Sequence, residues 1–355
     1  MSSIFSAVSL ALLTSSLVSA KCQKYVDAAV AAAENLQSTY FVNGGYGSQQ
    51  PWIGAVDSFH LTELDDLAGI STHADVINTV FTAWQGQLDN DNSYDDVQWV
   101  SIAYLRAGNL AQAQKYYDIA SILERPPRLQ KCYCAPFDLV PTRVPNHGTQ
   151  TNELFITSSG FLFDVTKDDN YLSNAQSTWS WLKASGMMGS NGLFNDGLTN
   201  VDGVCKNNEQ TQWTYNQGAL LPGLAYLFKY TGDETTITSA WAIMDAIIAS
   251  MTIDGGLREP CEITTQNNCN ADQQTFKGIT MHWMSWFLSV SGRDNDSKYS
   301  NFIRSQADKV LQFAVGAPNS YSNLWYGANA GSAVWTASTQ ASALGALIAA
   351  GQQNC

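Results

Sequence analysis

Apolar residues recur at helical spacing along most of the chain, and short breaks containing Gly and Asp interrupt them. In one clear case an apolar-periodic stretch covers 213–230, and a second begins at 237 after the break at Gly232 and Asp233. A Gly directly after an apolar run ends a helix, and an Asp that follows it begins the next one. The pattern therefore predicts a string of helical hairpins, without a convincing pair of strands.

Four such breaks recur at intervals of roughly 60 residues, a spacing longer than that of the commoner solenoid units. They lie at 104–109, 164–169, 229–233 and 289–294. Further helices fit 22–39, 59–69, 73–87 and 335–350, which brings the expected total to about eleven or twelve. Helices paired in this way would close into a toroid of hairpins, so we predict an all-α fold. The alternative is an open helical solenoid.

Long polar, Gly-rich loops connect the predicted helices and would collect at one end of such a toroid. They cover 43–51, 125–148, 186–208, 254–272 and 317–331. Long loops without secondary structure of their own are usually functional when they occur in a compact domain. We therefore expect these loops to form the walls of a cleft.

The first twenty residues resemble a secretory signal peptide. Residues 4–18 are mostly apolar, and Val18-Ser19-Ala20 would place small residues before a cleavage site. The stretch is too short for a typical membrane span, and neither a second apolar span nor an apolar C-terminal anchoring tail follows it. We therefore predict a signal peptide at 1–20 and a single domain at 21–355. The expected product is a secreted, extracellular or cell-wall-associated monomer without a membrane anchor.

The charge balance narrows the range of partners. A net charge of −13 argues against nucleic acid or an anionic membrane as the ligand. Charged residues make up 14% of the chain and aromatic residues 11%. Few charges and many aromatic rings suit a neutral, hydroxyl-rich polymer, although most of the rings are expected to fill the core.

Cysteine and histidine usage fits an extracellular protein without a metal site. Seven cysteines follow the predicted cleavage site and allow up to three disulfides and one free thiol. They are Cys22, Cys132, Cys134, Cys205, Cys261, Cys269 and Cys355. Cys261 and Cys269 flank a polar loop and are candidates to bridge each other. The four histidines show no ligand spacing, so neither a metal nor a cofactor is predicted. A glycosylation sequon lies at Asn295-Asp296-Ser297.

Two adjacent carboxylates, Asp95 and Asp96, open a predicted helix. In a structural interpretation Ser93 and Asp96 form a capping box, and both acids stabilise the positive end of the helix. In a catalytic interpretation they share one cleft, since glycoside cleavage needs one ionised and one protonated carboxyl group. Two carboxylates that lie close together cannot both ionise cheaply, so one of them keeps its proton.

Two other acidic pairs are interpreted as structural. Asp65-Asp66 lies in the middle of a predicted helix and is expected to be a solvated stripe. Asp168-Asp169 lies in one of the breaks and is expected to form a turn and a helix cap.

Several motifs together resemble glycoside hydrolase family 76. Residues 94–105, YDDVQWVSIAYL, are similar to the Asp-Asp helix of that family, and 212–218, QWTYNQG, are similar to its Trp-Thr-Tyr-Asn-Gln-Gly segment. Three shorter segments also fit, at 151–155, 257–259 and 274–278. The resemblance implies an (α/α)6 barrel, in agreement with the hairpin pattern. It also implies a secreted, fungal-type, retaining α-1,6-mannan hydrolase in which Asp95 is the nucleophile and Asp96 the acid/base.

The same motifs supply candidate substrate-binding residues, each with a structural alternative. Asn216 and Gln217 would bind sugar hydroxyls or cap a helix, and Trp213 and Tyr215 would stack on a sugar or pack in the core. Glu259 and Lys277 would meet in the cleft or form a structural ion pair, and Asn152 would line the pocket or cap its helix. Three loop tryptophans are further candidates for sugar stacking, with packing as the alternative: Trp52, Trp325 and Trp335.

Three functions fit these observations. The first is hydrolysis of α-1,6-mannosidic linkages in mannan or another mannose-containing glycan. The second is cell-wall transglycosylation on the mannose core of GPI-anchored proteins, and we favour it less because no anchoring tail is seen. The third is a mannan-binding wall protein without activity, which the intact Asp95 and Asp96 argue against.

Overall fold

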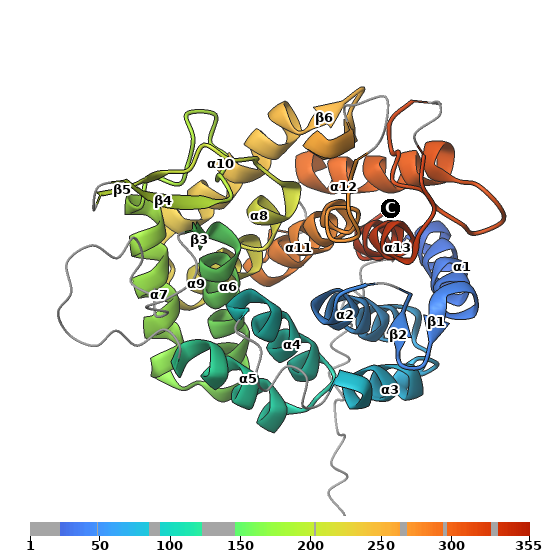
Figure 1. Cartoon of the computed structure of the whole chain (residues 1–355), viewed down its shortest axis with the longest axis horizontal. Helices are drawn as coiled ribbons and strands as arrows, with labels where there is room; N and C mark the ends of the chain where they lie inside the picture. Colours follow the sequence, from blue (N-terminus) through green and yellow to red (C-terminus); the bar gives the residue numbers. More distant parts are fainter. Residues whose placement is uncertain are drawn as a thin grey trace, which may run out of the picture.

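The computed structural model describes residues 22–47, 49–84, 93–122, 146–201, 204–262, 268–293, 297–327 and 333–355. Within these residues, six inner helices form a ring in which each contacts the next (Figure 1). They are α2 (Pro51–Ala68), α4 (Tyr94–Arg106), α6 (Thr149–Thr166), α9 (Leu221–Thr231), α11 (Phe276–Ser291) and α13 (Ala337–Gly351). Because α13 packs against α2, the ring is closed, and the alternative of an open solenoid is wrong.

An outer layer of helices surrounds this ring, each packed against an inner helix. These are α1 (Gln23–Tyr40), α3 (Ala74–Trp84), α5 (Leu110–Ile122), α7 (Asp169–Ala184), α10 (Glu234–Ser250) and α12 (Ser297–Lys309). A short helix, α8 (Thr214–Gly218), precedes α9, and a π-helical turn, Val310–Ala314, extends α12. The predicted all-α (α/α)6 barrel is confirmed.

The predicted helix breaks are also present. Asp168 and Asp233 cap α7 and α10 by accepting hydrogen bonds from the backbone N–H groups two residues later. Gly232 and Gly292 end α9 and α11 in the left-handed conformation, with φ of 68° and 69°. These caps explain why the repeating Gly and Asp breaks marked the hairpins correctly.

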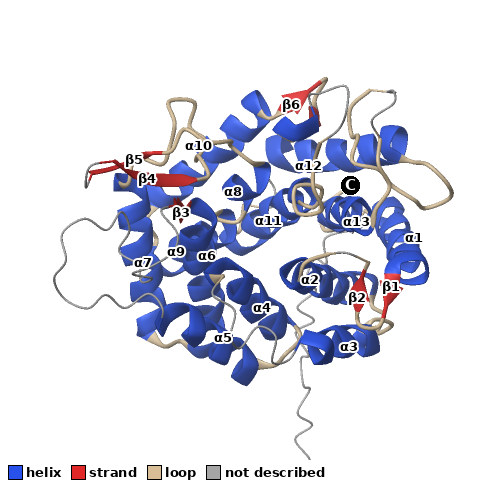
Figure 2. Ribbon diagram, in the orientation of Figure 1, coloured by secondary structure: helices blue, strands red, loops and turns tan. Residues whose placement is uncertain are grey.

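The expectation that no strands pair is wrong. Short antiparallel strands occur in the connections outside the helical ring (Figure 2). They are β1 (Phe41–Val42) with β2 (Gly45–Tyr46), β3 (Asn146–Gly148) with β4 (Gly197–Val201) and β5 (Val204–Asn207), and β6 (Thr252–Ile253) with β7 (Gly256–Leu257). Strands this short carry too few residues to show an alternating pattern.

The second helix begins eight residues earlier than its predicted start at 59. Pro51 occupies the first helical turn of α2, where its fixed φ suits the helix and its missing N–H costs nothing. The helix ends at Gly69, whose φ is 69°. The longer α2 brings Trp52 to the same end of the barrel as the start of α4.

Close backbone contacts hold the inner ring together. A Cβ atom at Gly278 of α11 would lie 2.2 Å from the backbone oxygen of Ser342 on α13. A Cβ at Gly160 of α6 would lie 2.9 Å from the Tyr226 side chain of α9. Glycine at these positions lets neighbouring inner helices approach more closely than any larger residue would allow.

The structure contains two disulfides among the described residues. Cys22 is bonded to Cys355, which ties the start of α1 to the end of the chain. The predicted bridge between Cys261 and Cys269 is confirmed. Cys132, Cys134 and the side chain of Cys205 lie outside the described part, as do the predicted signal peptide and most of the sequon.

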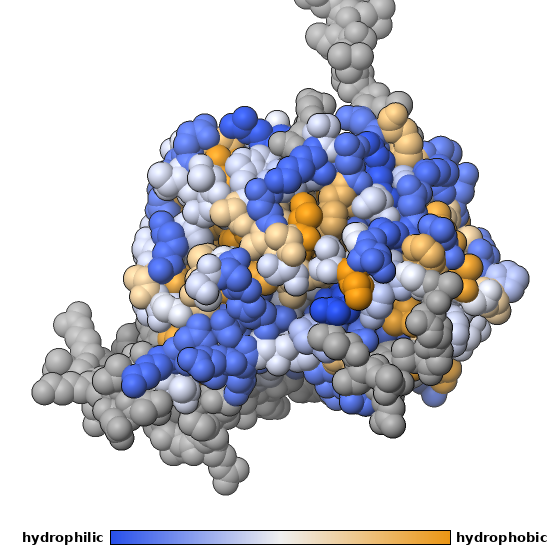
Figure 3. Space-filling model, turned by 90° about the horizontal axis from the view of Figure 1, so that it is seen from above, coloured by the Kyte–Doolittle hydropathy of each residue, from blue (hydrophilic) through white to orange (hydrophobic). Residues whose placement is uncertain are grey.

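Figure 3 shows one face of the molecule. On the face shown in Figure 3, hydrophilic side chains predominate and hydrophobic ones form small, separate groups. Of the described helices, none is long and apolar enough to cross a membrane. Among the described large hydrophobic side chains that are exposed, Trp335 is the only aromatic one, at 47% exposure.

Candidate active site

A cavity of about 320 Å³ opens at the end of the barrel where α2, α4 and α11 begin. Its lining consists of Gln50, Trp52, Asp95, Asp96, Trp99, Tyr215, Asp272 and Phe276. We call it the carboxylate cavity. Both members of the predicted catalytic pair therefore line one cavity, together with aromatic rings. Cavities of this size are typical of small-molecule sites.

Asp95 and Asp96 lie in the first turn of α4 and are partly buried. The positive end of the helix stabilises a carboxylate at this position. The predicted capping box is wrong, because Ser93 makes no side-chain bond to the helix backbone. Its hydroxyl donates instead to Oδ1 of Asp95, at 2.9 Å, and thereby helps to orient that carboxylate.

Three further carboxyl groups lie close enough to influence the site. Burial raises the pKa of Asp196, the Asn216 amide partly offsets this, and the charge of Asp95 raises it again. Burial and the charge of Asp95 likewise raise the pKa of Asp272. Burial raises the pKa of Glu153 well above its usual range, and Asp196 adds to the effect. So many carboxyl groups cannot all ionise together, which gives the site the capacity to hold and transfer a proton.

Tyr215 lies among these acids. Burial raises the pKa of its hydroxyl, and the charge of Asp196 is the next contribution. Its ring is parallel to that of Phe276, with centroids 3.7 Å apart, and Trp213 meets the same Phe276 edge-on at 5.7 Å. Tyr215 lies in the lining of the cavity, whereas Trp213 packs beside it against Phe276 and is not among the lining residues.

A second aromatic wall is built from Trp52 and Trp99, whose rings stack with centroids 6.0 Å apart. Trp99 lies four residues after Asp95 and three residues after Asp96, so it shares their face of α4. That spacing was available in the sequence and could have identified it. Asp196 lies within the loop predicted at 186–208, and Asp272 is the last residue of the loop predicted at 254–272. Both loops were expected to form cleft walls, but no sequence pattern distinguishes these two acids from other acidic residues in the loops.

Gln217 has a structural role rather than the predicted contact with sugar. It accepts from the Phe194 N–H at 2.8 Å and donates to the carbonyl oxygens of Phe194 and Trp213, at 2.9 and 3.1 Å. Its amide is thus used to fasten a loop to α8. Asn216 is buried next to Asp196, and Asn152 is buried near the start of α6.

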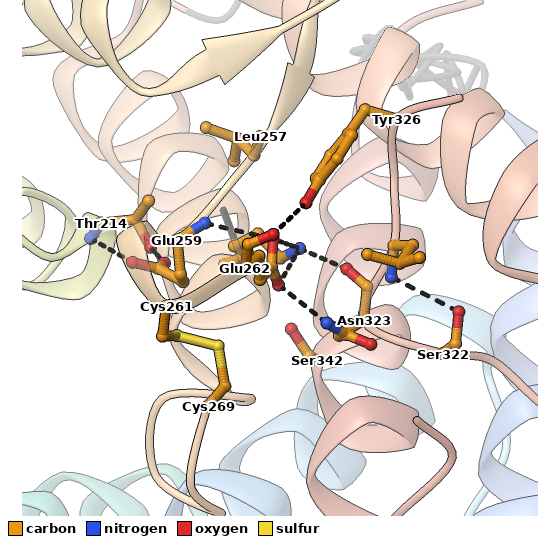
Figure 4. Close-up of polar contacts among 12 residues, drawn as sticks. Thr214, Leu257, Glu259, Cys261, Glu262, Cys269, Ser322, Asn323, Tyr326 and Ser342 are labelled. Atoms are coloured by element: carbon orange, nitrogen blue, oxygen red, sulfur yellow. Dashed lines mark hydrogen bonds and ion pairs between the residues drawn. A yellow bond between two sulfur atoms is a disulfide. The ribbon is translucent and has the colours of Figure 1, made fainter. Parts of the chain in front are cut away.

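Glu259 and Lys277 do not form the predicted pair. Lys277 is completely buried and donates to both oxygens of Glu262, at 2.8 and 3.0 Å, and to the Asn323 carbonyl. Figure 4 shows Glu259 facing Thr214, whose N–H and hydroxyl both donate to it. Because α8 begins at Thr214, Glu259 holds the helix that carries Tyr215.

The cluster is close to electrically neutral if Glu259 keeps its proton, because the Lys277 ammonium then balances the charge of Glu262. Burial raises the pKa of Glu259 to about 8, although the Thr214 hydrogen bonds oppose the shift. Neither Glu259 nor Lys277 lines the carboxylate cavity. Trp325 is also completely buried, beneath the Lys277 ammonium at 4.8 Å, and has no face available for a sugar.

The solvated stripe predicted at Asp65-Asp66 is half correct. Asp66 is 70% exposed and pairs with Arg106 at 2.9 Å. Asp65 is largely buried and lies 2.6 Å from Nδ1 of His73, so that prediction is wrong for Asp65. No group of three or more His, Cys, Asp or Glu side chains within the described residues has the arrangement needed to hold a metal ion.

A family model described as glycosyl hydrolase family 76 matches residues 146–354, which is more than half of the chain. This chain belongs to that family. The predicted family is therefore confirmed, and the Trp-Thr-Tyr-Asn-Gln-Gly segment at 212–218 lies within the matched residues.

Solved structures of similar fold come from the same family. One is an inactive variant, with two consecutive aspartates replaced by asparagine, of the α-1,6-mannanase GH76A of Salegentibacter sp. HEL1_6 in complex with α-1,6-mannotriose. It is 19% identical, has a TM-score of 0.75, and the match covers 92% of this chain and 99% of that one. Dfg5 from Chaetomium thermophilum in complex with glucosamine also has a TM-score of 0.75, at 19% identity over 93% of this chain and 90% of that one.

Among curated relatives, the mannan endo-1,6-α-mannosidase DCW1 of Saccharomyces cerevisiae is 30% identical over 146 residues. The match covers 38% of this family 76 chain and 31% of that relative. A putative mannan endo-1,6-α-mannosidase of Schizosaccharomyces pombe is 27% identical over 181 residues, 48% of this chain and 40% of the relative. The chain thus spans less than half of the length of these two relatives.

Proposed function

We propose that this family 76 chain is a retaining glycoside hydrolase that cleaves α-1,6-mannosidic linkages in mannan. The observation that carries the proposal is the presence of Asp95 and Asp96 in one cavity with aromatic walls. Neutral sugars present alternating apolar faces and hydroxyl rims, and a cavity that combines rings with carboxylates suits both.

In the proposed mechanism Asp95 is the nucleophile. Its ionised carboxylate is stabilised by the start of α4 and by the Ser93 hydroxyl, and it attacks the anomeric carbon. The bond from that carbon to the glycosidic oxygen breaks as Asp96 donates a proton to the leaving oxygen. Asp96 then removes a proton from water, which attacks the mannosyl–Asp95 ester and releases the sugar with its original configuration.

The neighbouring acids suit this division of roles. The pKa values of the Asp196 and Asp272 carboxyls are raised because both groups are partly buried and lie near the charge of Asp95. A proton held on either neighbour removes like charge from beside Asp95 and so favours the ionised form of Asp95 that a nucleophile requires. Tyr215, held by Glu259 through Thr214, completes the wall next to the acids.

The properties of similar proteins agree with this substrate. A family member of the same fold is an α-1,6-mannanase whose inactive variant has two consecutive aspartates replaced, and the curated relatives are named mannan endo-1,6-α-mannosidases. We also propose that residues 1–20 direct secretion and that 21–355 form the enzyme, acting outside the cell or at the cell wall.

The direct test incubates the secreted protein with linear α-1,6-mannan and follows product size and anomeric configuration by NMR. We expect shorter mannans with α configuration at the new reducing end, and loss of turnover in Asp95→Ala. Unchanged turnover in Asp95→Ala would refute the role of that residue. An added mannose oligosaccharide that becomes incorporated into the products would identify transglycosylation instead of hydrolysis.

A further inference from the structure

A second cavity, of about 400 Å³, lies beside the carboxylate cavity. It is lined by Tyr40, Tyr46, Gly47, Gln49, Ala271, Gln274, Trp335, Thr336, Ala337 and Ser338. We call it the Trp335 compartment. Two pairs of consecutive residues lie between the cavities. Gln49 and Ala271 line the Trp335 compartment, whereas the residues that follow them, Gln50 and Asp272, line the carboxylate cavity. The two spaces therefore lie next to each other and share walls.

The Trp335 indole is held in place from one side. A Cβ at Gly316 would lie 2.6 Å from its Nε1, so the ring rests against that glycine. The next residue, Thr336, forms a capping box with Thr339 at the start of α13 and donates to Oε1 of Gln274 at 2.6 Å. With its backbone fixed and 47% of the residue exposed, Trp335 presents an ordered aromatic surface to the compartment.

The chemistry of the compartment differs from that of its neighbour. No charged side chain is among its described lining residues, whereas Asp95, Asp96 and Asp272 line the carboxylate cavity. Its polar groups are amides and hydroxyls that already brace the walls. Gln49, for example, lies 3.2 Å from the Ser338 hydroxyl and 3.0 Å from Oδ2 of the buried Asp57. An uncharged ligand with an apolar face and hydroxyl groups fits such a surface.

We infer that the Trp335 compartment is a second sugar subsite, in which a neutral hexose unit of the glycan stacks on Trp335 while another unit occupies the carboxylate cavity. This inference rests on the proposed function, because it assigns the compartment to the same glycan chain. It predicts that longer oligosaccharides gain affinity from Trp335 and that very short ones gain little.

The test measures dissociation constants by calorimetry for α-1,6-mannobiose and α-1,6-mannotetraose. The parent protein is the Asp96→Asn variant, in which slow turnover lets binding be measured. The quantity of interest is the ratio of the mannobiose constant to the mannotetraose constant. Trp335→Ala should reduce this ratio about tenfold, as expected when part of one indole face loses a buried contact. Trp335→Phe, which keeps an aromatic face, should reduce it less.

Gly316→Ala provides a second perturbation that leaves the indole in the chain. Its Cβ would displace Trp335 from its resting place, so the ratio should fall here too. Val165→Ala is the matched control, because Val165 is 56% exposed near the end of α6 and far along that helix from the cavity. It should leave both constants unchanged.

The outcomes separate the two proposals. If the parent binds mannotetraose more tightly than mannobiose and Trp335→Ala leaves the ratio unchanged, the subsite is refuted while the proposed function stands. If Trp335→Ala weakens both ligands equally, Trp335 acts on the fold or on the carboxylate cavity, and the subsite is again refuted. If the parent binds neither ligand, the proposed function fails and the subsite assignment fails with it.

Discussion

Replacing Lys277 with methionine should destabilise the fold severely without acting through substrate. The ammonium is completely buried and donates to both oxygens of Glu262 and to the Asn323 carbonyl. Without it, the bonds that remain to the Glu262 carboxylate from the part of the chain that the structure describes are longer, from the Asn323 amide at 3.3 Å and the Glu259 N–H at 3.2 Å. An uncompensated buried charge of this kind costs about 3–5 kcal/mol, so we expect a loss of that size in the free energy of unfolding.

Equilibrium unfolding in guanidinium chloride measures the effect. Lys298→Met is the matched control, because Lys298 pairs with Asp245 at 2.5 Å on the surface, with both side chains about half exposed. Breaking this exposed pair should cost less than about 1 kcal/mol. Adding Glu262→Gln to Lys277→Met should recover part of the loss, since the buried charge is then removed. A Lys277→Met protein as stable as the Lys298→Met protein would refute the assignment of Lys277 to the core.

Three other substitutions test the contact between α11 and α13, the buried Glu259 carboxyl and the role of Asp96. Gly278→Ala should lower the unfolding free energy by about 1–3 kcal/mol or more, because its Cβ would meet the Ser342 backbone at 2.2 Å. An unchanged melting temperature in thermal unfolding would contradict the close contact between α11 and α13. Glu259 has a pKa of about 8 in the fold against an ordinary value of 4.5, so its contribution to stability is complete below pH 4.5 and is lost as pH rises to about 8. Between pH 5 and pH 8.5 the free energy of unfolding should therefore decrease less in the Glu259→Gln protein than in the wild type. An equal decrease in the two proteins would count against the raised pKa. Asp96→Asn should abolish cleavage of mannan but retain more activity on mannosides with good leaving groups, and equal loss on both substrates would argue against an acid/base role.

Much of the fold could be predicted from the sequence because its determinants are local. Helical periodicity and the caps at Asp168, Asp233 and Gly232 act over one or two turns, so they marked the hairpins correctly. The predicted start of α2 at 59 is too late, and the loop predicted at 43–51 includes the residue at which the helix begins. In the structure Pro51 begins the helix.

The candidate site was predictable where one element carried it. Asp95 and Asp96 are consecutive and share a helix start, so their common cavity followed once that helix was identified. Lys277 and Glu262 lie 15 positions apart, and nothing in the sequence distinguished Glu262 from Glu259 as the partner. The choice depends on the 3₁₀ turn Pro260–Glu262, which directs the second carboxylate toward the lysine.

Long-range assembly also explains which acids were missed. Asp196 reaches the site because its carbonyl accepts from the N–H of Thr149 at the start of α6, at 2.8 Å. Asp272 lies at the turn just before α11 and enters the cavity only when the barrel closes. Such placements are set by tertiary contacts and leave no periodic signal.

In the proposed mechanism Asp95 becomes covalently bonded to the sugar during the reaction. A mannosyl donor with fluorine in place of its 2-hydroxyl and with a good leaving group should form this ester quickly and release it slowly. Peptide mass spectrometry should then find one fluoromannosyl group on Asp95, and none on the Asp95→Asn protein. A label on another carboxyl group, such as Asp196 or Asp272, or mannan cleavage with inversion and no label, would contradict the account.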